Sequence, residues 1–230
     1  MRATRADLWG HLDELRSTLI KMCLTSLIGF CICFFYHKHI LSWIVAPIDQ
    51  QLALLSPFEG FLTACKISFV AAITLTSPIL IYYILTFILP ALHKKEKRLI
   101  LPICLLSYIM ITFGILFAYH LTLPLSLRFL QNFSVGLNIW SLSKTVTFLL
   151  SLLFAHAFAF ELVVIALFLT HINILKQRHL TQSRRMVYVI TFIAAAILTP
   201  PDVVSQLLLA IPLILLFETI VLYASLKKSI

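Results

Sequence analysis

The stretch ISFVAAITLTSPILIYYILTFILPALHKKEKRLILPICLLSYIMITFGILFAY, residues 67–119, decides the fold. It contains two apolar runs, 67–89 and 99–119, separated by the basic segment HKKEKR at 93–98. Each run is long enough to cross a bilayer core of about 30 Å as a helix that rises about 1.5 Å per residue. The stretch therefore predicts two transmembrane helices joined by a short cationic loop.

The same pattern continues in both directions along the chain. Of the 230 residues, 61% are hydrophobic and 12% are charged, about half the charged fraction of a soluble domain. We predict an all-α integral membrane protein with a single domain, 1–230, in which a cytoplasmic amphipathic tail, 1–18, precedes six transmembrane helices. The predicted spans are 19–36, 67–89, 99–119, 146–170, 186–198 and 203–217.

The last two predicted spans are short and form a hairpin around the turn TPPD at 199–202. Between Arg185 and this turn there are only 13 apolar-rich residues, which is about 20 Å of helix. Antiparallel partners cover the same depth, so we expect the corner to fall short of the outer surface. Either the bilayer thins there or a water-filled depression forms. Asp202 is the predicted N-cap of the sixth helix, and Glu218 is expected at the cytoplasmic interface.

The distribution of Lys and Arg predicts the orientation. Fourteen of them lie in the two tails and in the 91–98 and 171–186 loops, and four lie in the other connections. Cytoplasmic loops of membrane proteins are enriched in these residues, so both termini are predicted to be cytoplasmic. The net charge of +9 is explained by topology, and no nucleic-acid partner is expected.

Catalytic and cofactor motifs are absent from the sequence. It contains no HExxH, GxSxG or GxxxxGK[ST] motif, and its five glycines form no phosphate-binding loop. The five cysteines have neither CxxC nor metal-ligand spacing. We therefore predict a protein that is not an enzyme and has no cofactor and no metal site.

Glu161 is the acidic residue deepest in a predicted span. It lies ten residues before His171, hence about 15 Å below the cytoplasmic end of its helix. An ionisable group at this depth is costly and is a functional candidate by default, as a polar contact for a partner helix or as a protonatable site. The alternative interpretation is a neutral acid that bonds a neighbouring helix for packing. A secondary solute transporter or proton pathway that uses Glu161 is therefore an alternative function.

The remaining acids look ordinary when judged by pattern alone. Leucines at 8, 12, 15 and 19 form one helical stripe, which predicts a short helix on the cytoplasmic interface, with Glu14 projecting away from it. Glu96 is the only acid among four cations in the 93–98 segment. Glu59 and Asp49 are expected outside, as solvated or capping groups.

Six segments together carry a resemblance to a known family. They are HLDELR (11–16), AP (46–47), SPFEGF (56–61), FILPALHKKEKR (87–98), FAFE (158–161) and LTPPDVVSQLLLAIPLILLFE (198–218). With these, the chain resembles the TatC family, the receptor subunit of the twin-arginine, Sec-independent protein translocase, nearly from end to end. The resemblance implies a concave helical bundle in the cell inner membrane, in contact with membrane lipid.

The resemblance also implies a function and its residues. A TatC receptor binds twin-arginine signal peptides of folded proteins, whose export is driven by the proton-motive force. Signal-peptide binding would then involve acids at Glu14 and Glu96. The further implied residues are Arg16, Phe87 and Pro90 for the signal peptide, Glu161, Asp202 and Gln206 for partner helices, and Pro47 and Pro57 as periplasmic structural positions.

The implied partners are TatA- and TatB-like single-span subunits, and self-association in a larger complex is expected. The sequence departs from the family pattern in the fourth span. Family members usually have a glycine four residues before the glutamate and often a proline two residues after it, where this chain has Ala157 and Val163. This departure predicts a straighter and less closely packed helix.

Overall fold

A computed structural model of the protein describes residues 5–48, 52–88, 100–133, 139–172, 174–200 and 202–228. These residues are almost entirely helical, with two short strands. The elements in chain order are α1 (Arg5–Phe35), α2 (His37–Val45), β1 (Leu52–Ala53), α3 (Glu59–Ile88), α4 (Ile100–Phe117), the π-helical turn η3 (Ala118–Thr122), α5 (Leu123–Gln131), β2 (Trp140–Ser141), α6 (Leu142–His171), α7 (Gln177–Gln182), α8 (Arg184–Leu198) and α9 (Val203–Lys228).

Five helical segments in the described part of the chain are long and apolar enough to cross a membrane. They are Asp13–Phe35, Glu59–Phe87, Ile100–Gln131, Leu142–His171 and Val203–Lys227, and they overlap five of the six predicted spans. The predicted fifth span corresponds to α8, which has 15 residues and is therefore only about 22 Å long. The structure thus supports a helical membrane fold, and α8 is too short to count as a complete span by length alone.

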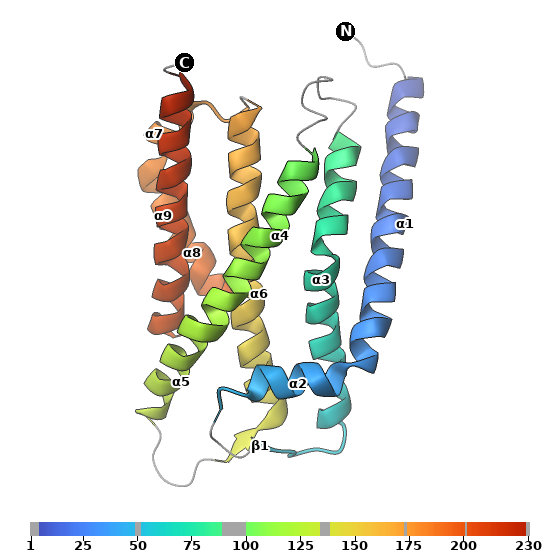
Figure 1. The fold of residues 1–230 in the computed structure, drawn as a ribbon, viewed down its shortest axis with the longest axis vertical. Helices are drawn as coiled ribbons and strands as arrows, with labels where there is room; N and C mark the ends of the chain where they lie inside the picture. The colour runs from blue at the N-terminus through green and yellow to red at the C-terminus, as the bar shows by residue number, and fades with distance from the viewer. Residues whose placement is uncertain are drawn as a thin grey trace.

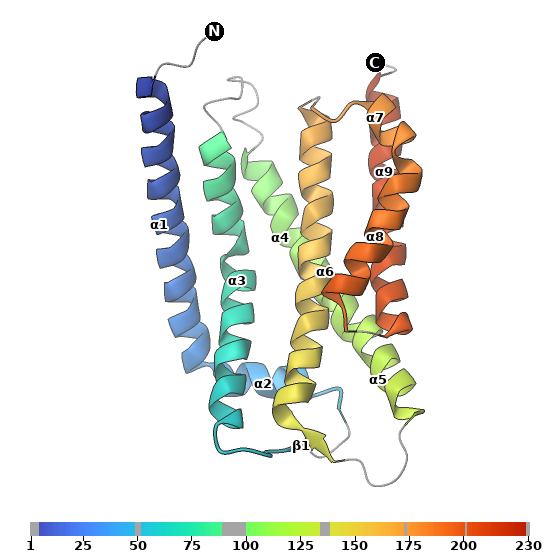
Figure 2. The same ribbon diagram turned by 180° about the vertical axis from the view of Figure 1, so that it is seen from behind.

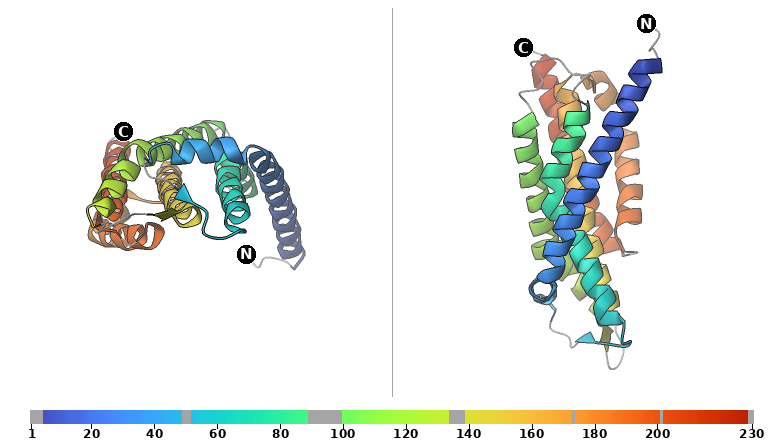
Figure 3. Two further views of the ribbon diagram at one scale, coloured as in Figure 1. Left: turned by 90° about the horizontal axis from the view of Figure 1, so that it is seen from below. Right: turned by 90° about the vertical axis from the view of Figure 1, so that its right-hand side faces the viewer.

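The helices stand roughly side by side in a curved arrangement. The start of α1 and the end of α9 lie at the same end of the molecule (Figure 1). Seen from below, α1, α3, α6 and the α8–α9 pair form a curved row, and α2, α4 and α5 lie along one side of it (Figure 3). The long helix α4 crosses this row obliquely, so that it contacts both α3 and α6.

The hairpin formed by α8 and α9 has the predicted shape. Its corner lies well above the lower ends of α3 and α6 (Figure 2). Asp202 caps α9 as predicted, because its Oδ2 accepts a hydrogen bond from the Ser205 backbone N–H at 2.7 Å and its Oδ1 accepts one from the Ser205 hydroxyl at 2.6 Å. A carboxylate here also interacts favourably with the helix dipole. The short depth of the hairpin is thus a consequence of the turn sequence.

Several helices extend beyond the predicted spans. The tail does not form a helix of its own, since α1 runs without a break from Arg5 to Phe35. Good helix formers occupy most of positions 11–22, so nothing ends the helix between the tail and the first span. The second and fourth spans start earlier than predicted, and the third continues to Gln131. The chain is also not purely helical, because β1 and β2 pair in parallel, with Leu52 opposite Trp140.

The helix of the last span extends beyond the predicted point, at 217, where the span leaves the membrane. Helix α9 continues through Glu218 to Lys228. Arg184 Nη2, at the start of α8, lies 3.2 Å from Glu218 Oε2, and the Tyr188 hydroxyl donates to the same carboxylate. A charged group with such partners is satisfied inside a helix bundle. Glu218 therefore joins α9 to the start of α8.

Glu59 joins the start of α3 to the start of α6, at the end of the molecule opposite the described start of α1 and end of α9. Its Oε2 accepts from the Leu55 backbone N–H at 2.5 Å, and its Oε1 accepts from the Ser143 backbone N–H at 2.8 Å and from the Ser141 hydroxyl. Ser141 is the N-cap of α6, so Glu59 caps a helix that lies more than eighty residues away in the sequence. The capping interpretation is confirmed, and the solvated one is wrong because Glu59 is only 7% exposed.

We predict that Glu59→Ala lowers the free energy of unfolding, because it removes the carboxylate that accepts from the backbone N–H groups of Leu55 and Ser143. Thermal unfolding of the purified chain in detergent measures this effect. Glu59→Gln is the matched control, since its amide oxygen still accepts one of the bonds and its loss is expected to be smaller. An unfolding curve for Glu59→Ala that matched the unchanged protein would contradict the role.

The two prolines predicted to be structural lie at this same end. Pro47 is half-buried just after α2, and Pro57 is exposed in the turn that leads into α3. Helix α2 packs across the ends of the long helices (Figure 1). Its Trp43 ring stacks on Tyr119 with a centroid distance of 4.3 Å, and the Tyr119 hydroxyl donates to the Trp43 carbonyl at 2.8 Å. These contacts hold short elements in place over this end of the helical bundle.

Candidate functional site

The first candidate site lies where α1 and α3 run side by side near the described start of the chain. Glu14 and Arg16 are both exposed on α1, and Phe87 is half-buried one residue before the end of α3. Pro90 and Glu96 lie outside the described residues. Because α3 ends at Ile88 and α4 begins at Ile100, the segment that carries both of them connects helices at this same end of the molecule.

The packing of α1 on α3 sets the level of Glu14. At Gly29 the two helices touch so closely that an added Cβ would lie 2.7 Å from Thr76 Cγ2 and 3.6 Å from the Ala72 carbonyl oxygen. Glu14 precedes Gly29 by fifteen residues, and Phe87 follows Ala72 by fifteen. Both helices rise about 1.5 Å per residue in opposite directions, so Glu14 and Phe87 stand at about the same height. The structure therefore places Glu14 at the level of the last turn of α3, after which the 89–99 segment follows in the sequence.

The second candidate site is the carboxyl group of Glu161, which lies between α3, α4 and α6. Its Oε1 accepts a hydrogen bond from the Ser107 hydroxyl of α4 at 3.0 Å. Its Oε2 is buried and has no hydrogen-bond partner within the described ranges. The carboxyl group borders a cavity of about 210 Å³ whose other walls are mainly Ile, Leu, Val and Phe side chains. One oxygen is thus satisfied by a neighbouring helix, and the other faces apolar surroundings.

The prediction of loose packing around Glu161 was wrong. A Cβ at Gly114 of α4 would lie 2.9 Å from the His156 carbonyl oxygen and 3.2 Å from Phe160 Cγ. Small residues let helix backbones approach closely inside a membrane. The family pattern has a glycine on α6 where this chain has Ala157. Here the close approach of the two helices occurs instead at Gly114 of the facing helix α4. This contact sets the rotation of α6 and so presents Glu161 to Ser107.

His156 belongs to a separate polar contact. Its Nε2 lies 3.1 Å from the Thr122 hydroxyl, at the end of the π-helical turn, and its Nδ1 lies 2.9 Å from the Leu152 carbonyl oxygen. The ring is completely buried. Glu161 is five residues away, about 140° round the helix, and its described hydrogen bond goes to Ser107 and not to His156. His156 connects α6 to the lower half of the third span.

Asp202 and Gln206, the remaining predicted partner-contact residues, bond within the α8–α9 hairpin. Asp202 is 9% exposed and caps α9, and Gln206 Nε2 donates to the Phe192 carbonyl of α8 at 3.1 Å. The Arg184–Glu218 ion pair was missed by sequence reasoning. It could have been found from hairpin geometry, because the two residues lie at nearly equal distances from the 199–202 turn.

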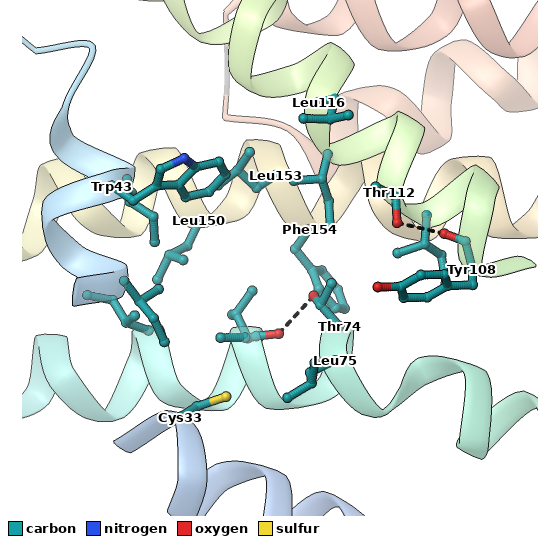
Figure 4. A pocket seen from close by; sticks show the side chains of 17 residues that line it. Cys33, Trp43, Thr74, Leu75, Tyr108, Thr112, Leu116, Leu150, Leu153 and Phe154 are labelled. Atoms are coloured by element: carbon teal, nitrogen blue, oxygen red, sulfur yellow. Dashed lines mark hydrogen bonds between the residues drawn. The ribbon is translucent and has the colours of Figure 1, made fainter. Parts of the chain in front are cut away.

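A larger cavity, of about 460 Å³, opens between α2, α3, α4 and α6 (Figure 4). Its lining is apolar apart from a few groups. Two of these, the hydroxyls of Thr74 and Thr112, donate to carbonyls of their own helices, at 2.9 Å and 2.8 Å. A cavity of this kind has little capacity for polar recognition or catalysis.

Comparisons with known proteins agree with this architecture. The family model described as Sec-independent protein translocase protein (TatC) matches residues 10–212. A relative of that name from Helicobacter pylori strain J99 is 38% identical over 221 residues, which cover 95% of this chain and 88% of the relative. The relative of the same name from Aquifex aeolicus is 36% identical and is covered to 90%, as is this chain.

Solved structures agree as well. A crystal structure described as the twin-arginine translocase receptor TatC superposes with a TM-score of 0.83 at 34% identity, covering 95% of this chain and 99% of that one. A second, described as the same receptor in DDM, has a TM-score of 0.84, also at 34% identity, and covers 93% and 99%. The match therefore extends over nearly the whole of both chains.

Proposed function

The chain belongs to the TatC family of Sec-independent protein translocase proteins, and from this we propose that it is the receptor that binds twin-arginine signal peptides and helps to export folded proteins across the cell inner membrane. The family is a component of a transport machine and not an enzyme. Membership of this family also favours protein translocation over the alternative function, a solute transporter or proton pathway that uses Glu161.

One observation carries the proposal. Glu14 stands at the height of Phe87, at the end of the molecule where the connection between α3 and α4 leaves and returns. That connection contains Glu96. The proposed site thus combines an acid of α1 with an acid of the segment that connects α3 and α4. A peptide with two adjacent positive charges has complementary chemistry.

The chemistry of arginine explains the required signal. A guanidinium group is planar and always charged, and it can donate two parallel hydrogen bonds to one carboxylate. A lysine ammonium has no such fork and is held as a point charge. Glu14 would hold one arginine and Glu96 the other, with Arg16, Phe87 and Pro90 at the border of the site. The apolar part of the signal peptide would then lie along the exposed apolar surface of α1 and α3.

Orientation follows from the charge distribution. The end with Glu14 also has all four cation-rich segments joined to described helix ends, namely those at the start of α1, between α3 and α4, between α6 and α8, and at the end of α9. By the positive-inside rule this end is cytoplasmic, with both termini inside. In this orientation the signal peptide arrives from the compartment in which its folded passenger was made. The proton-motive force would supply the driving energy.

Glu161 is proposed to contact the TatA- and TatB-like single-span subunits. Its Oε2 is buried and accepts no hydrogen bond from any described group, and a polar group in this state is costly unless a partner satisfies it. A polar side chain of an arriving helix would do so. The short α8–α9 hairpin, capped by Asp202 and cross-linked by Gln206, would present a rigid surface for the same partners in the larger, self-associated complex.

The test uses the purified chain in lipid nanodiscs and a signal peptide with a photo-reactive group next to its two arginines. We expect crosslinks to the early part of α1 and to the 88–100 region. A twin-lysine peptide is expected to crosslink at least about tenfold less, because it cannot form the forked bonds. Equal crosslinking by both peptides would contradict the proposed recognition. Labelling of a cysteine at Lys95→Cys by an impermeant reagent from outside intact cells would contradict the orientation.

A further inference from the structure

A cavity of about 430 Å³ lies between α4, α6 and α9 and forms a groove along the bundle. Figure 1 shows α4 and α9 separating toward the end of the molecule where α1 starts, with α6 visible between them. Each of these helices lines the groove with residues about one turn apart, from 102 to 110 on α4, from 163 to 171 on α6 and from 216 to 223 on α9. The groove is therefore about 12 Å long.

The groove is polar at one end and apolar along the rest of its length. At the end of α6, His171 Nδ1 lies 2.7 Å from the Tyr223 hydroxyl of α9. The Thr219 hydroxyl donates to the Leu216 carbonyl of its own helix at 2.6 Å, so its hydrogen is not directed at the groove. The other lining residues are Pro, Ile, Leu, Met, Val and Phe. A ligand with one polar end and a long apolar part matches this distribution.

The groove lies at the depth of lipid tails. All three lining helices belong to segments long and apolar enough to cross a membrane, namely Ile100–Gln131, Leu142–His171 and Val203–Lys227. Beside the groove, the walls carry exposed apolar side chains, Leu105 and Ile109 on α4 and Leu215 and Leu222 on α9. Apolar cavities do not hold water well, because a water molecule needs polar partners. The groove is therefore open to lipid and suited to an apolar occupant.

The width of the groove distinguishes between two apolar occupants, a helix and a lipid tail. A volume of 430 Å³ along about 12 Å corresponds to a mean cross-section of about 36 Å². A transmembrane helix about 10 Å across has a cross-section of about 80 Å², more than twice as much. A lipid tail is a single chain of methylene groups and is far thinner than a helix. The groove therefore fits a tail and is too narrow for a helix.

We propose that this groove binds one acyl chain of a phospholipid from the leaflet at this end of the molecule. The ester and phosphate region of the lipid lies next to His171 and Tyr223, and the end of the tail lies near Met110 and Leu216. Tyrosines are typical of the boundary between tails and headgroups. Binding depends on van der Waals packing of the tail against three helices, since lipid and protein interior are almost equally apolar.

The bound tail would support the wall of the Glu161 cavity. Ile103, Val164 and Phe168 line both this groove and the cavity that the Glu161 carboxyl group borders. A single layer of side chains therefore separates the two spaces. A tail in the groove fills the gap between α4 and α9 and keeps that layer in place.

The test uses the full chain in lipid nanodiscs with a trace of a phosphatidylcholine that carries a photo-reactive group near the end of one tail. After illumination we expect adducts on Leu106, Met110 and Leu216. A photo-reactive group placed near the headgroup should label His171 and Tyr223 instead. After transfer of the chain to detergent, native mass spectrometry should detect a retained phospholipid.

Thr219→Trp tests the fit of the tail. Thr219 is exposed and lines the groove, so the indole ring takes the space of the tail without entering the protein core. We expect the adducts and the retained lipid to fall by about tenfold. Thr219→Val keeps the shape of the side chain, and Val189→Trp adds the same ring on an exposed face of α8. Both controls, and phosphatidylglycerol in place of phosphatidylcholine, should change binding by less than about threefold.

Each alternative outcome overturns the proposal. Unchanged adducts in Thr219→Trp, or an equal loss in Val189→Trp, would mean that the tail does not occupy the groove. Much stronger retention of phosphatidylglycerol than of phosphatidylcholine would mean that headgroup charge, and not the tail, determines binding. Loss of the adducts when single-span subunits are coexpressed would mean that the groove holds a helix. Thermal unfolding of every variant confirms that the differences are measured on folded protein.

Discussion

Glu14→Lys is expected to lower crosslinking of a twin-arginine signal peptide by roughly 10- to 100-fold. The substitution removes a carboxylate that would bond a guanidinium, an interaction of about 1.5–3 kcal/mol when one partner is charged, and it adds a repulsive charge. Glu14 is exposed on α1, so the lysine can be accommodated without disturbing the packing. The peptide assay in nanodiscs measures the effect directly.

Asp13 supplies the matched control. It is the neighbouring residue, it is also exposed, and Asp13→Lys makes the same change in charge. It points about 100° away around the helix, so its effect should stay within about threefold. Glu96→Ala is expected to weaken crosslinking as Glu14→Lys does, and the double variant to abolish it. If Asp13→Lys and Glu14→Lys lowered peptide crosslinking equally, the effect would come from the total charge at this end of the molecule and not from the carboxylate of Glu14.

Glu161→Leu is expected to have opposite effects on the isolated chain and on its complex. In the isolated chain the substitution removes a buried Oε2 that accepts no bond from the described helices, and the Ser107 hydroxyl can turn to its own helix backbone. The free energy of unfolding should therefore stay level or rise. Copurification of the TatA- and TatB-like subunits should fall by roughly 5- to 30-fold, the value of an interhelical polar contact of about 1–2 kcal/mol in a membrane.

The opposite signs separate a contact for partners from a packing role. Ser107→Ala is the matched control, because it removes the hydrogen bond at Oε1 and leaves the carboxyl group for a partner. It should lower the stability of the isolated chain slightly and preserve copurification. A Glu161→Leu chain that unfolded more easily yet kept its partners would show that Glu161 serves only to hold α4 on α6.

The gross architecture could be predicted from the sequence because it depends on local patterns. Long apolar runs predicted the helical segments, and the 199–202 turn predicted a hairpin that stops short. The cap at Asp202 was predicted too, because an N-cap is a contact between residues three apart in the chain, here Asp202 and Ser205. Boundaries were less accurate, since α1, α3 and α9 each continue past the apolar run that predicted them.

The site residues were a different case. Glu14 and Glu161 could be named only through the resemblance and through depth in the membrane, and neither signal says what these side chains touch. Glu59 was classed as solvated or capping, yet it bonds Ser143, eighty-four residues away. The tight contact of Gly114 on α6 was not foreseen, because the family pattern places the glycine on the other helix.

By itself, the sequence determined which segments are long and apolar enough to cross a membrane, where the chain turns and which connections carry the positive charge. Those properties follow from the transfer of each segment between water and lipid, which depends on local composition. Only the tertiary structure decided how each helix is rotated about its axis, and with it the contacts of Glu161 with Ser107, Gly114 with His156 and Glu218 with Arg184. Lipid tails and helix interiors are almost equally apolar, so hydrophobic periodicity does not distinguish the face that meets a neighbour from the face that meets lipid.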